Sequence, residues 1–395
     1  MDVMHYNKVK LIAVAKDEGA YLAEWIHHHL YFGFHEIEIV LNRTKDCSKE
    51  MLTKIKQAYP MVKWRYADFV DLIPGSVHKK LQHIAYGMVL SDDMNSTDAS
   101  FSHFMFLDID EFWVPVDEKS TISTFIENAG RVEAIAFNWL NDVPSTQPFT
   151  KIQPVFTGNS SDVVKSLVPL SRSLKAIRIH KPLLKPDSYL LADGKPFIAS
   201  QHNEEHSARS TYSGAFVYHR FYRSEIEYVS NLYRGNPEGN DVPYKTNRSG
   251  LPFKASATHE ISFPGSDYEN YATSFKKFVE ACNLKPLIDV ANEFVLQRYE
   301  NAVASLPKNL PVYHSQILRL FKNVSEPRIV RAIVEYHDRL VDGYGKSVEP
   351  IRDLAIKVES YSIAEARRIM LKALALRPEG PRINAKINEY NQKVD

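Results

Sequence analysis

Short apolar segments alternate with amphipathic, helix-like segments through the first 140 residues, and this alternation constrains the fold more than any other feature of the chain. The run Val9–Ala15 is rich in branched apolar side chains, which is typical of a strand buried on both faces. Ala20–Phe32 follows it with apolar residues at helical spacing, and Gly33 is placed to end that helix. A β-α-β-α order predicts an α/β fold, in which helices cover both faces of a mostly parallel sheet.

The alternation continues as far as Trp139. The further predicted strands are Glu36–Leu41, Val62–Tyr66, Ser102–Leu107 and Glu133–Trp139. The predicted helices between them are Ser48–Ala58, Ser76–Leu90 and Thr121–Asn128. In open sheets of this kind, ligands bind beyond the carboxyl ends of the strands. The candidate site is therefore formed by the segments that follow those ends, which are Lys16–Glu18, Asn42–Asp46, Asp108–Asp110 and Asn138–Asp142.

The rest of the chain has a different pattern. Residues 145–270 contain many prolines and polar runs, so we expect a loop-rich extension of the first domain. From about Tyr271 helical periodicity continues to the end, and one hairpin around Pro378–Pro381 resembles a single tetratricopeptide unit. Such repeats need about three copies to be stable, so we infer no function from the hairpin. We predict an α/β domain over residues 1–270 and a helical domain over residues 271–395.

Composition excludes several classes of protein. The chain has 49 Lys and Arg against 48 Asp and Glu, and this balance argues against nucleic acid as a partner. Two cysteines, Cys47 and Cys282, exclude a disulfide scaffold and fit a reducing compartment. No run of about 18 apolar residues is present, and the first apolar run is too short for a signal peptide. We therefore expect a cytoplasmic protein whose membrane contact, if any, is peripheral.

The strongest chemical motif is Phe106–Phe112, in which a buried strand ends in Asp-Ile-Asp-Glu. Alternate residues of an extended chain point the same way, so Asp108 and Asp110 are expected to face one hard cation, Mg²⁺ or Mn²⁺. A cation held there could stabilise a diphosphate leaving group. The alternative is a solvated strand end at which Asp begins a turn.

Two further motifs lie on the first strand and helix. Lys16, Asp17 and Glu18 follow the strand where a nucleotide commonly binds, although helix capping explains Asp17 and Glu18 equally well. The absence of G-x-G-x-x-G from the sequence argues against a typical dinucleotide site. The run His27–His29 cannot chelate one ion, because consecutive helical residues point about 100° apart. We expect His28 or His29 to pack or hydrogen-bond beneath the sheet.

These segments together resemble the signature of family-2-like and family-92-like glycosyltransferases. The resemblance covers roughly residues 9–235 and rests, in order, on Lys16–Glu18, Glu24–Ile26, His28–Leu30, Gly33-Phe34, Asn42, Asp46–Ser48, Gln82, Phe106–Phe112, Phe137–Trp139, Lys175, His180–Pro182, Val217–Tyr222 and Arg234-Gly235. Asp17 stands where the family usually has Asn. Leu140–Asp142 replaces the small residues expected after the tryptophan, so the acceptor chemistry does not carry over.

The resemblance implies a GT-A-type fold and metal-dependent, inverting transfer of a hexose from a nucleotide diphosphate sugar. The donor would be UDP-linked, the acceptor a saccharide or glycolipid, and the pathway surface polysaccharide or lipopolysaccharide synthesis. The implied donor-binding residues are Lys16, Glu18, Asn42, Asp46, Lys79, Gln82, Asp108 and Ile109. The implied metal ligands are Asp108, Asp110 and His219. The implied acceptor-binding residues are Trp139, Lys175 and His180.

Inverting transfer needs a carboxylate that deprotonates the acceptor hydroxyl. Asp142, at the end of the Trp139 strand, is the first candidate, and Glu204 or Glu205 in the loop Gln201–Arg209 is the second. Two other classes of function stay open. One is a degenerate transferase that recruits a partner through its helical C-terminus. The other is a metal-dependent nucleotidyltransferase. That class would have a phosphate loop rich in Gly, Arg and Lys near the N-terminus, whereas the Lys16–Ala20 segment supplies only one glycine, Gly19.

Overall fold

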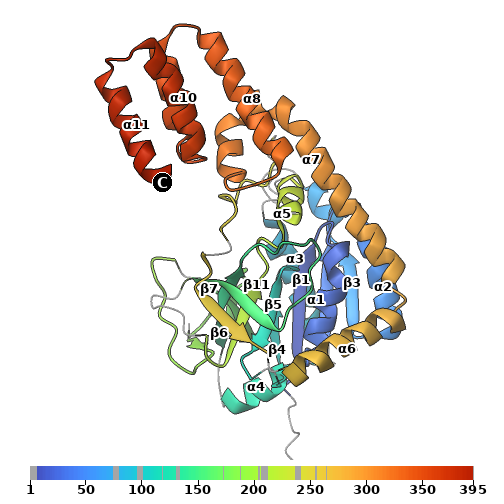
Figure 1. The fold of residues 1–395 in the computed structure, drawn as a ribbon. Helices are drawn as coiled ribbons and strands as arrows, with labels where there is room; N and C mark the ends of the chain where they lie inside the picture. Colours follow the sequence, from blue (N-terminus) through green and yellow to red (C-terminus); the bar gives the residue numbers. More distant parts are fainter. Residues whose placement is uncertain are drawn as a thin grey trace, which may run out of the picture. The chain divides into compact units, whose positions relative to one another are not determined.

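The computed structural model describes most of the chain, in two compact units (Figure 1). The described residues are 7–73, 80–95, 101–117, 119–129, 134–171, 173–186, 188–202, 205, 212–235, 242–253, 256–263 and 265–394. The first unit comprises residues 1–143, 149–223 and 255–294. The second unit comprises residues 144–148, 224–254 and 295–395.

The first unit is built on one large sheet with the strand order β3-β2-β1-β4-β7-β6-β11-β5. Strand β10 also pairs with β6, β12 pairs with β7, and β8 and β9 form a separate small sheet. The strands are β1 (Val9–Ala15), β2 (Glu36–Leu41), β3 (Val62–Tyr66), β4 (His103–Phe106), β5 (Glu111–Pro115), β6 (Ile135–Asp142), β7 (Val155–Pro169), β8 (Leu174–Ala176), β9 (Leu183–Leu184), β10 (Leu190–Leu191), β11 (Ala215–His219) and β12 (His259–Ser262).

Strand direction places the candidate segments at one edge of this sheet. Strands β3, β2, β1 and β4 are parallel, and β7 is antiparallel to both β4 and β6. Strand β6 therefore runs with β4, and β11 is parallel to β6. The predicted α/β fold with a mostly parallel sheet is confirmed. The sheet order also reverses at β1, because β2 lies on one side of it and β4 on the other, and such a switch point is where open sheets bind ligands.

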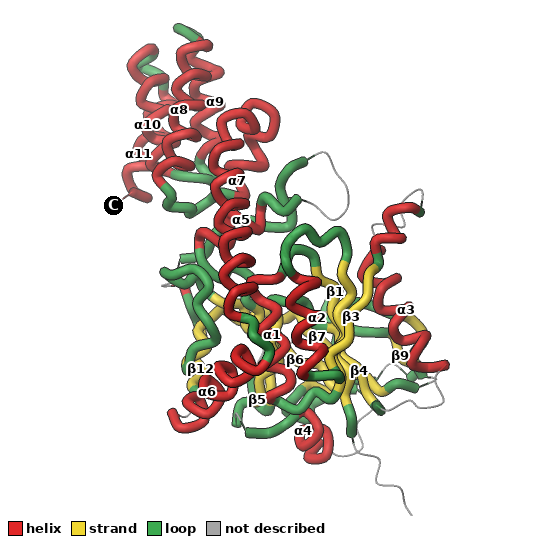
Figure 2. Tube along the Cα trace, turned by 90° about the vertical axis from the view of Figure 1, so that its right-hand side faces the viewer, coloured by secondary structure: helices red, strands yellow, loops and turns green. Residues whose placement is uncertain are grey.

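Helices cover both faces of the sheet: α1 and α2 lie on one side of the strands and α3 lies on the other (Figure 2). The helices of the first unit are α1 (Gly19–Tyr31), α2 (Ser48–Ala58), α3 (Leu81–Asn95), α4 (Ile122–Ala129) and α6 (Gly265–Ala281), with a short 3₁₀ helix at Asp68–Leu72. Helix α1 ends where Gly33 predicts, since Gly33 has φ +82° and a Cβ there would lie 2.8 Å from Thr121. The predicted start of α3 at Ser76 lies outside the described residues.

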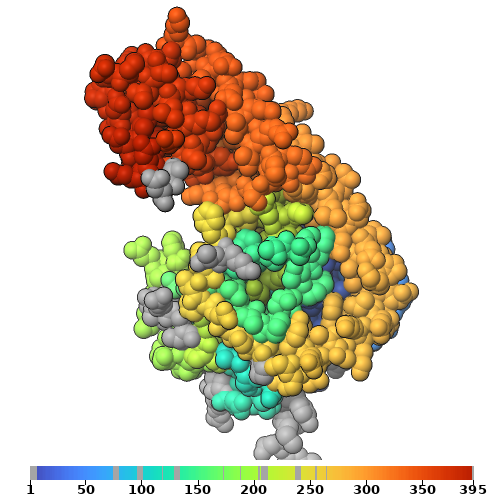
Figure 3. All heavy atoms as spheres, in the orientation of Figure 1, coloured from blue at the N-terminus to red at the C-terminus, as the bar shows by residue number. Residues whose placement is uncertain are grey.

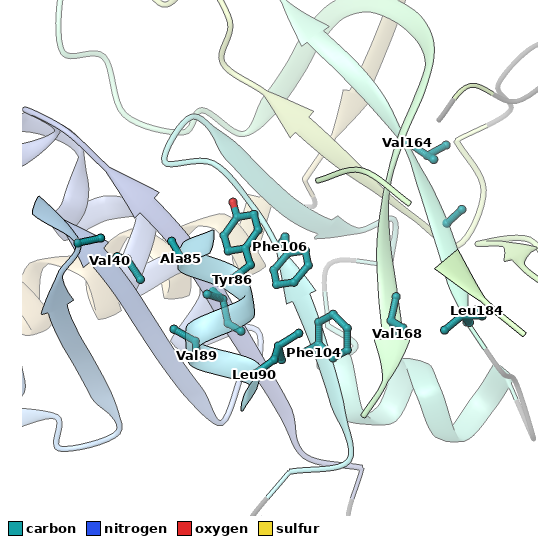
Figure 4. Packing of buried hydrophobic residues seen from close by; sticks show 14 of the residues in the cluster. Val40, Ala85, Tyr86, Val89, Leu90, Phe104, Phe106, Val164, Val168 and Leu184 are labelled. Atoms are coloured by element: carbon teal, nitrogen blue, oxygen red, sulfur yellow. The ribbon is translucent and has the colours of Figure 1, made fainter. Parts of the chain in front are cut away.

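Helix α3 is fixed to the sheet by apolar packing. Its buried face, Ala85, Tyr86, Val89 and Leu90, lies against Phe104 and Phe106 of β4 in one cluster (Figure 4). The Tyr86 and Phe106 rings stack at 4.0 Å with an interplanar angle of 6°. Burying aromatic side chains of this size contributes about 1.5–3 kcal/mol each. This packing holds the start of α3 next to the end of β4, where the acidic motif begins.

A buried lysine adds a polar tie on the same face. Lys10 of β1 is 1% exposed, and its Nζ lies 2.8 Å from Glu36, 2.7 Å from Glu38 and 2.7 Å from Asp93. Burial would lower the pKa of Lys10, but the three carboxylates outweigh it and raise that pKa. Because Asp93 lies on α3 and both glutamates lie on β2, this one ammonium group links two strands and a helix.

Two expectations about the chain's organisation differ from the structure. Residues 145–270 do not form only loops, because Val155–Pro169 is the long strand β7 between β4 and β6. Polar residues in its first half hide the strand pattern. The expected boundary between residues 270 and 271 falls inside α6, which packs on α1 in the first unit. Helical periodicity predicts that α6 is a helix, but it does not indicate which of the two units the helix packs against.

The second unit is helical. It contains α5 (Glu225–Leu232), the greater part of α7 (Lys285–Leu320), α8 (Pro327–Tyr344), α9 (Val348–Val358), α10 (Ile363–Leu376) and α11 (Pro381–Val394). Helices α9, α10 and α11 pack in succession, and the orange and red atoms of the C-terminal helices form a closely packed body in Figure 3. Among the described residues, no helix has the length and apolar character needed to cross a membrane.

The three consecutive histidines of α1 form hydrogen bonds in the interior. His28 Nε2–H donates to Trp113 O at 2.8 Å, and His29 Nδ1–H donates to Trp25 O at 2.8 Å. His27 contacts Ser274 of α6 through its Nε2, and its ring lies within 5.8 Å of four aromatic rings. Burial lowers the pKa of His27 to about 4 and that of His28 to about 3. The packing prediction for His28 and His29 is confirmed.

These neutral histidines make the stability of the first unit depend on pH. Between pH 6.5 and 4 the unfolded chain binds a proton at His27 that the folded chain does not, so the free energy of unfolding falls as pH falls. One such group contributes at most about 1.4 kcal/mol per pH unit. We expect His27→Phe, which keeps the aromatic contacts, to reduce the pH slope by about that amount.

Urea unfolding followed by tryptophan fluorescence measures this, because all four tryptophans, Trp25, Trp64, Trp113 and Trp139, lie in the first unit. His202→Asn, at an exposed position, is the control and should keep the wild-type slope. Equal pH slopes for wild type and His27→Phe would contradict the prediction.

Candidate functional site

The acidic motif is a turn and not the extended strand end that the spacing predicts. The Glu111 N–H donates to Asp108 O at 2.9 Å, and the Asp108 N–H donates to the Glu111 side chain at 2.9 Å. Strand β4 ends at Phe106 and β5 begins at Glu111. Residues 108–111 form the turn that joins β4 to β5. The argument from strand alternation therefore does not apply to Asp108 and Asp110.

Asp108 is held by two side chains. Gln82 Nε2 donates to its Oδ1 at 2.9 Å. Lys165 Nζ lies 3.4 Å from Asp108 Oδ2 and 3.1 Å from Glu111 Oε2. Both Lys165 and Glu111 are fully buried, whereas the Asp108 side chain is 33% exposed. Asp108 thus faces the sheet edge with its charge already balanced by Lys165.

Asp110 lies against His219 at the end of β11. The distance from His219 Nε2 to Asp110 Oδ1 is 3.7 Å, and the Arg220 N–H donates to Asp110 O at 2.7 Å. His219 Nδ1 lies 3.1 Å from Asn141 Oδ1, and its Nε2 faces Asp110. Histidines that bind metals commonly donate their other ring N–H to a fixed oxygen atom.

These contacts decide which residues could hold a cation. A separation of 3.7 Å is shorter than two Mg²⁺–ligand bonds of about 2.1 Å each, so Asp110 and His219 could share one ion. No set of three or more His, Cys, Asp or Glu side chains with metal-binding geometry occurs among the described residues. The remaining ligands would come from phosphate oxygens and water, as is common for Mg²⁺. The predicted ligand Asp108 instead bonds Gln82 and Lys165.

An aromatic group borders the site. The Trp139 ring lies 4.2 Å from that of His219 and 5.2 Å from that of His180. His180 Nδ1–H donates to Val164 O at 3.2 Å, and burial lowers the pKa of His180 to about 3, so this ring is neutral. The structure thus brings Trp139 and His180 together beside the candidate metal ligand. Trp139 lies within β6 and not beyond its end, since that strand continues to Asp142.

The end of β1 supplies a second wall of candidate residues. Glu18 precedes α1, and its carboxylate lies 3.7 Å from Arg223 Nη1. The Arg223 guanidinium lies over the Tyr21 ring at 3.3 Å. Asp17 adopts φ 53°, a conformation that Asp and Asn tolerate best, and its carboxylate accepts the Lys45 N–H at 2.7 Å. Lys16 lies between this turn and the last residue of β1.

Other predicted donor-binding residues make structural contacts at the same edge. Asn42 Nδ2 donates to Ala67 O at 3.2 Å. Asp46 accepts from the Gly19 N–H at 2.7 Å and from Ser48 Oγ at 2.6 Å, so it links the starts of α1 and α2. These bonds give Asp46 a structural role at the starts of both helices. The side chain of Ile109 is buried, which leaves the backbone as its means of contacting a ligand.

Three predicted residues lie apart from this group. Lys175 is exposed on β8 of the small two-stranded sheet. Lys79 and Glu204 lie outside the described residues. Glu205 is described, and its backbone bridges to Val163 of β7 while Ser200 Oγ donates to its Oε2 at 3.2 Å.

Asp142 does not have the surroundings of a catalytic base. Its two carboxylate oxygens accept the backbone N–H groups of Tyr222 and Arg223 at 2.9 and 2.8 Å, and the residue is 2% exposed. Burial raises the pKa of this carboxyl to about 7, a value that would suit a base. The carboxyl is nearly fully buried, however, and its contacts indicate that Asp142 anchors the segment after β11.

Lys165 is the main site residue that the sequence interpretation missed. A single lysine stands in the largely apolar run Val163–Val168. Lysine is almost never fully buried unless it is paired. An isolated lysine in such a run is therefore a signal for a buried carboxylate elsewhere, and here the carboxylates are Asp108 and Glu111.

The anchoring role of Asp142 is testable without an activity assay. Asp142→Asn replaces one acceptor oxygen by an amide that cannot accept the backbone N–H, so the free energy of unfolding should fall by about 1–3 kcal/mol. Urea unfolding of the first unit by tryptophan fluorescence measures this. Asp162→Asn, at an exposed position on β7, is the matched control and should have no effect. Unchanged stability of Asp142→Asn would leave Asp142 free for another role.

Comparison with known proteins adds no family assignment. No model of a protein family matches this chain, and no curated protein sequence matches it either.

Proposed function

We propose that this chain is a glycosyltransferase with a GT-A-type domain, which transfers a hexose from a nucleotide diphosphate sugar to a saccharide or glycolipid acceptor. The observation that carries the proposal is the arrangement at the ends of β4 and β11. Asp108 is held by Gln82 and Lys165, and Asp110 lies 3.7 Å from a histidine whose other nitrogen is already bonded. This group lies at the switch point of an open sheet, where ligands of α/β folds bind.

The two aspartates would have different tasks. Asp108 keeps part of its carboxylate exposed while Lys165 balances its charge, which suits a hydrogen bond to a neutral ribose hydroxyl. Asp110 and His219 suit a divalent cation, Mn²⁺ or Mg²⁺. When bound, such a cation offsets the negative charge of the departing diphosphate.

Residues around the site suit the sugar side of a donor or acceptor. Trp139 offers an aromatic surface beside His180 and His219. His180 donates through Nδ1, so its Nε2 is an acceptor for a hydroxyl. On the nucleotide side, Lys16 and the Glu18–Arg223 pair lie at the end of the adjacent strand β1. A UDP-linked hexose matches this order of polar and aromatic groups along the sheet edge.

The base is proposed from the loop that pairs with β7. The backbone of Glu205 is bridged to Val163, two residues before Lys165 on the strand that borders the site. Glu204 is its neighbour in the sequence. Because Asp142 anchors the backbone, these two glutamates are the remaining candidates from the sequence analysis for the base that deprotonates an acceptor hydroxyl.

Metal-dependent nucleotide binding tests the proposal directly. We expect calorimetry to give at least about tenfold tighter UDP binding with Mn²⁺ than without it, and Asp110→Asn to abolish that difference, because it removes a charged ligand. Asp162→Asn should keep the wild-type response. Parallel titrations with GDP and dTDP identify the preferred nucleotide. If Mn²⁺ does not change the affinity of the wild-type protein for any of the three nucleotides, the proposal of a metal-dependent transferase is refuted.

The base is tested with a pair of variants, Glu204→Gln and Glu205→Gln, each of which keeps the side-chain shape and removes basicity. One of them should lower the transfer rate by about 10²–10⁴ while UDP affinity stays unchanged. The other variant is then the matched control for the loop. Full activity in both variants and in the double variant would remove this loop from the mechanism.

A further inference from the structure

The second unit contains a pocket of about 440 Å³ between α7, α8 and α9. It lies where α7 is interrupted: Tyr313 has non-helical angles, φ −117° and ψ 26°, two residues after Pro311. Proline has no N–H to continue the helical hydrogen bonds, which accounts for an interruption here. The next residue, His314, lines the pocket and is 7% exposed.

A chain of buried hydrogen bonds leads from this pocket into the core of the unit. His314 Nε2 lies 3.0 Å from His337 Nε2, and His337 Nδ1 lies 2.8 Å from Glu365 Oε1. Arg368 donates to both oxygens of Glu365 at 2.7 and 2.8 Å. Although burial opposes it, the hydrogen bonds from Arg368 and His337 lower the pKa of Glu365, so this group is a carboxylate at neutral pH.

With His337 neutral, the carboxylate fixes the position of every proton along the chain. Ionised Glu365 can only accept, so His337 carries its proton on Nδ1 and accepts at Nε2. His314 must then donate from Nε2, and its Nδ1 is left as an acceptor. Burial lowers the pKa of His314 to about 4, so its ring is neutral. Within the described part of the chain, Nδ1 of His314 forms no hydrogen bond, so a pocket ligand could use it.

The other lining residues define the chemistry of a ligand. Tyr336 and Tyr344 offer aromatic faces, Gln316 can both donate and accept, and Asp353 and Lys357 contribute one charge of each sign. The opposite charges balance, which gives no preference for an anion such as a phosphate. Aromatic faces together with mixed donors and acceptors suit an uncharged molecule with several hydroxyl groups.

We propose that this pocket binds an uncharged saccharide unit, with one sugar hydroxyl donating to His314 Nδ1. The Glu365–His337–His314 chain is then a positioning device, because it keeps an acceptor, and never a donor, at the floor of the pocket. This binding site belongs to the helical unit alone and does not depend on the transferase site of the first unit.

Ligand-observed NMR with the full chain tests the proposal. The probes are the methyl glycosides of glucose, galactose, mannose and N-acetylglucosamine, with uridine and adenosine as competing chemistry. We expect saturable binding of at least one glycoside and a loss of affinity of at least about tenfold in Leu340→Trp, which fills the pocket. Leu371→Trp, on an exposed position of α10, is the matched control and should bind as wild type does.

Two readouts separate this pocket from the first unit and from a purely structural histidine pair. UDP affinity should be equal in Leu340→Trp and wild type. Nitrogen-15 NMR should find the proton of His314 on Nε2 and that of His337 on Nδ1. The proposal is overturned if no glycoside binds saturably, if Leu340→Trp binds glycosides as tightly as wild type, if only the nucleosides lose affinity in that variant, or if His314 carries its proton on Nδ1.

Discussion

The arrangement of the candidate site depends on one buried ammonium group, that of Lys165. A fully buried lysine is stable as a cation only beside negative charge, and here Asp108 and Glu111 supply it at 3.4 and 3.1 Å. Both carboxylates belong to the turn that joins β4 to β5. Because β7 carries Lys165 and lies next to β4, the pairing of these two strands and the conformation of the turn stabilise each other.

The same pairing gives the two aspartates of the motif different surroundings. Lys165 is paired with Asp108 and Glu111, whereas Asp110 lies 3.7 Å from the imidazole of His219. Burial raises the pKa of Glu111 well above its usual range, and Lys165 opposes that effect. Asp110 lies 3.7 Å from His219, the residue with which it would share a cation in the proposed function.

Much of the first unit could be predicted because its signals are local. The strands Val9–Ala15, Glu36–Leu41 and Val62–Tyr66 have the predicted bounds, since each is a short apolar or alternating run. Strand β7 could not be predicted in the same way, because its pairing with β4, β6 and β12 joins residues far apart in the chain. The polar first half of β7 pairs with strands that are distant in the sequence, so no local sequence pattern predicts this pairing.

Asp110 and Asp142 illustrate why the site was harder to predict than the fold. Each is an aspartate close to the carboxyl end of a strand; Asp110 is interpreted from the sequence as a metal ligand and Asp142 as the base. The two aspartates differ in how the segment after β11 contacts each of them. The backbone N–H groups of Tyr222 and Arg223 occupy both oxygens of Asp142, whereas a histidine side chain faces Asp110. Residues 219–223 thus determine both roles, from about 80 positions away from Asp142 and more than 100 from Asp110.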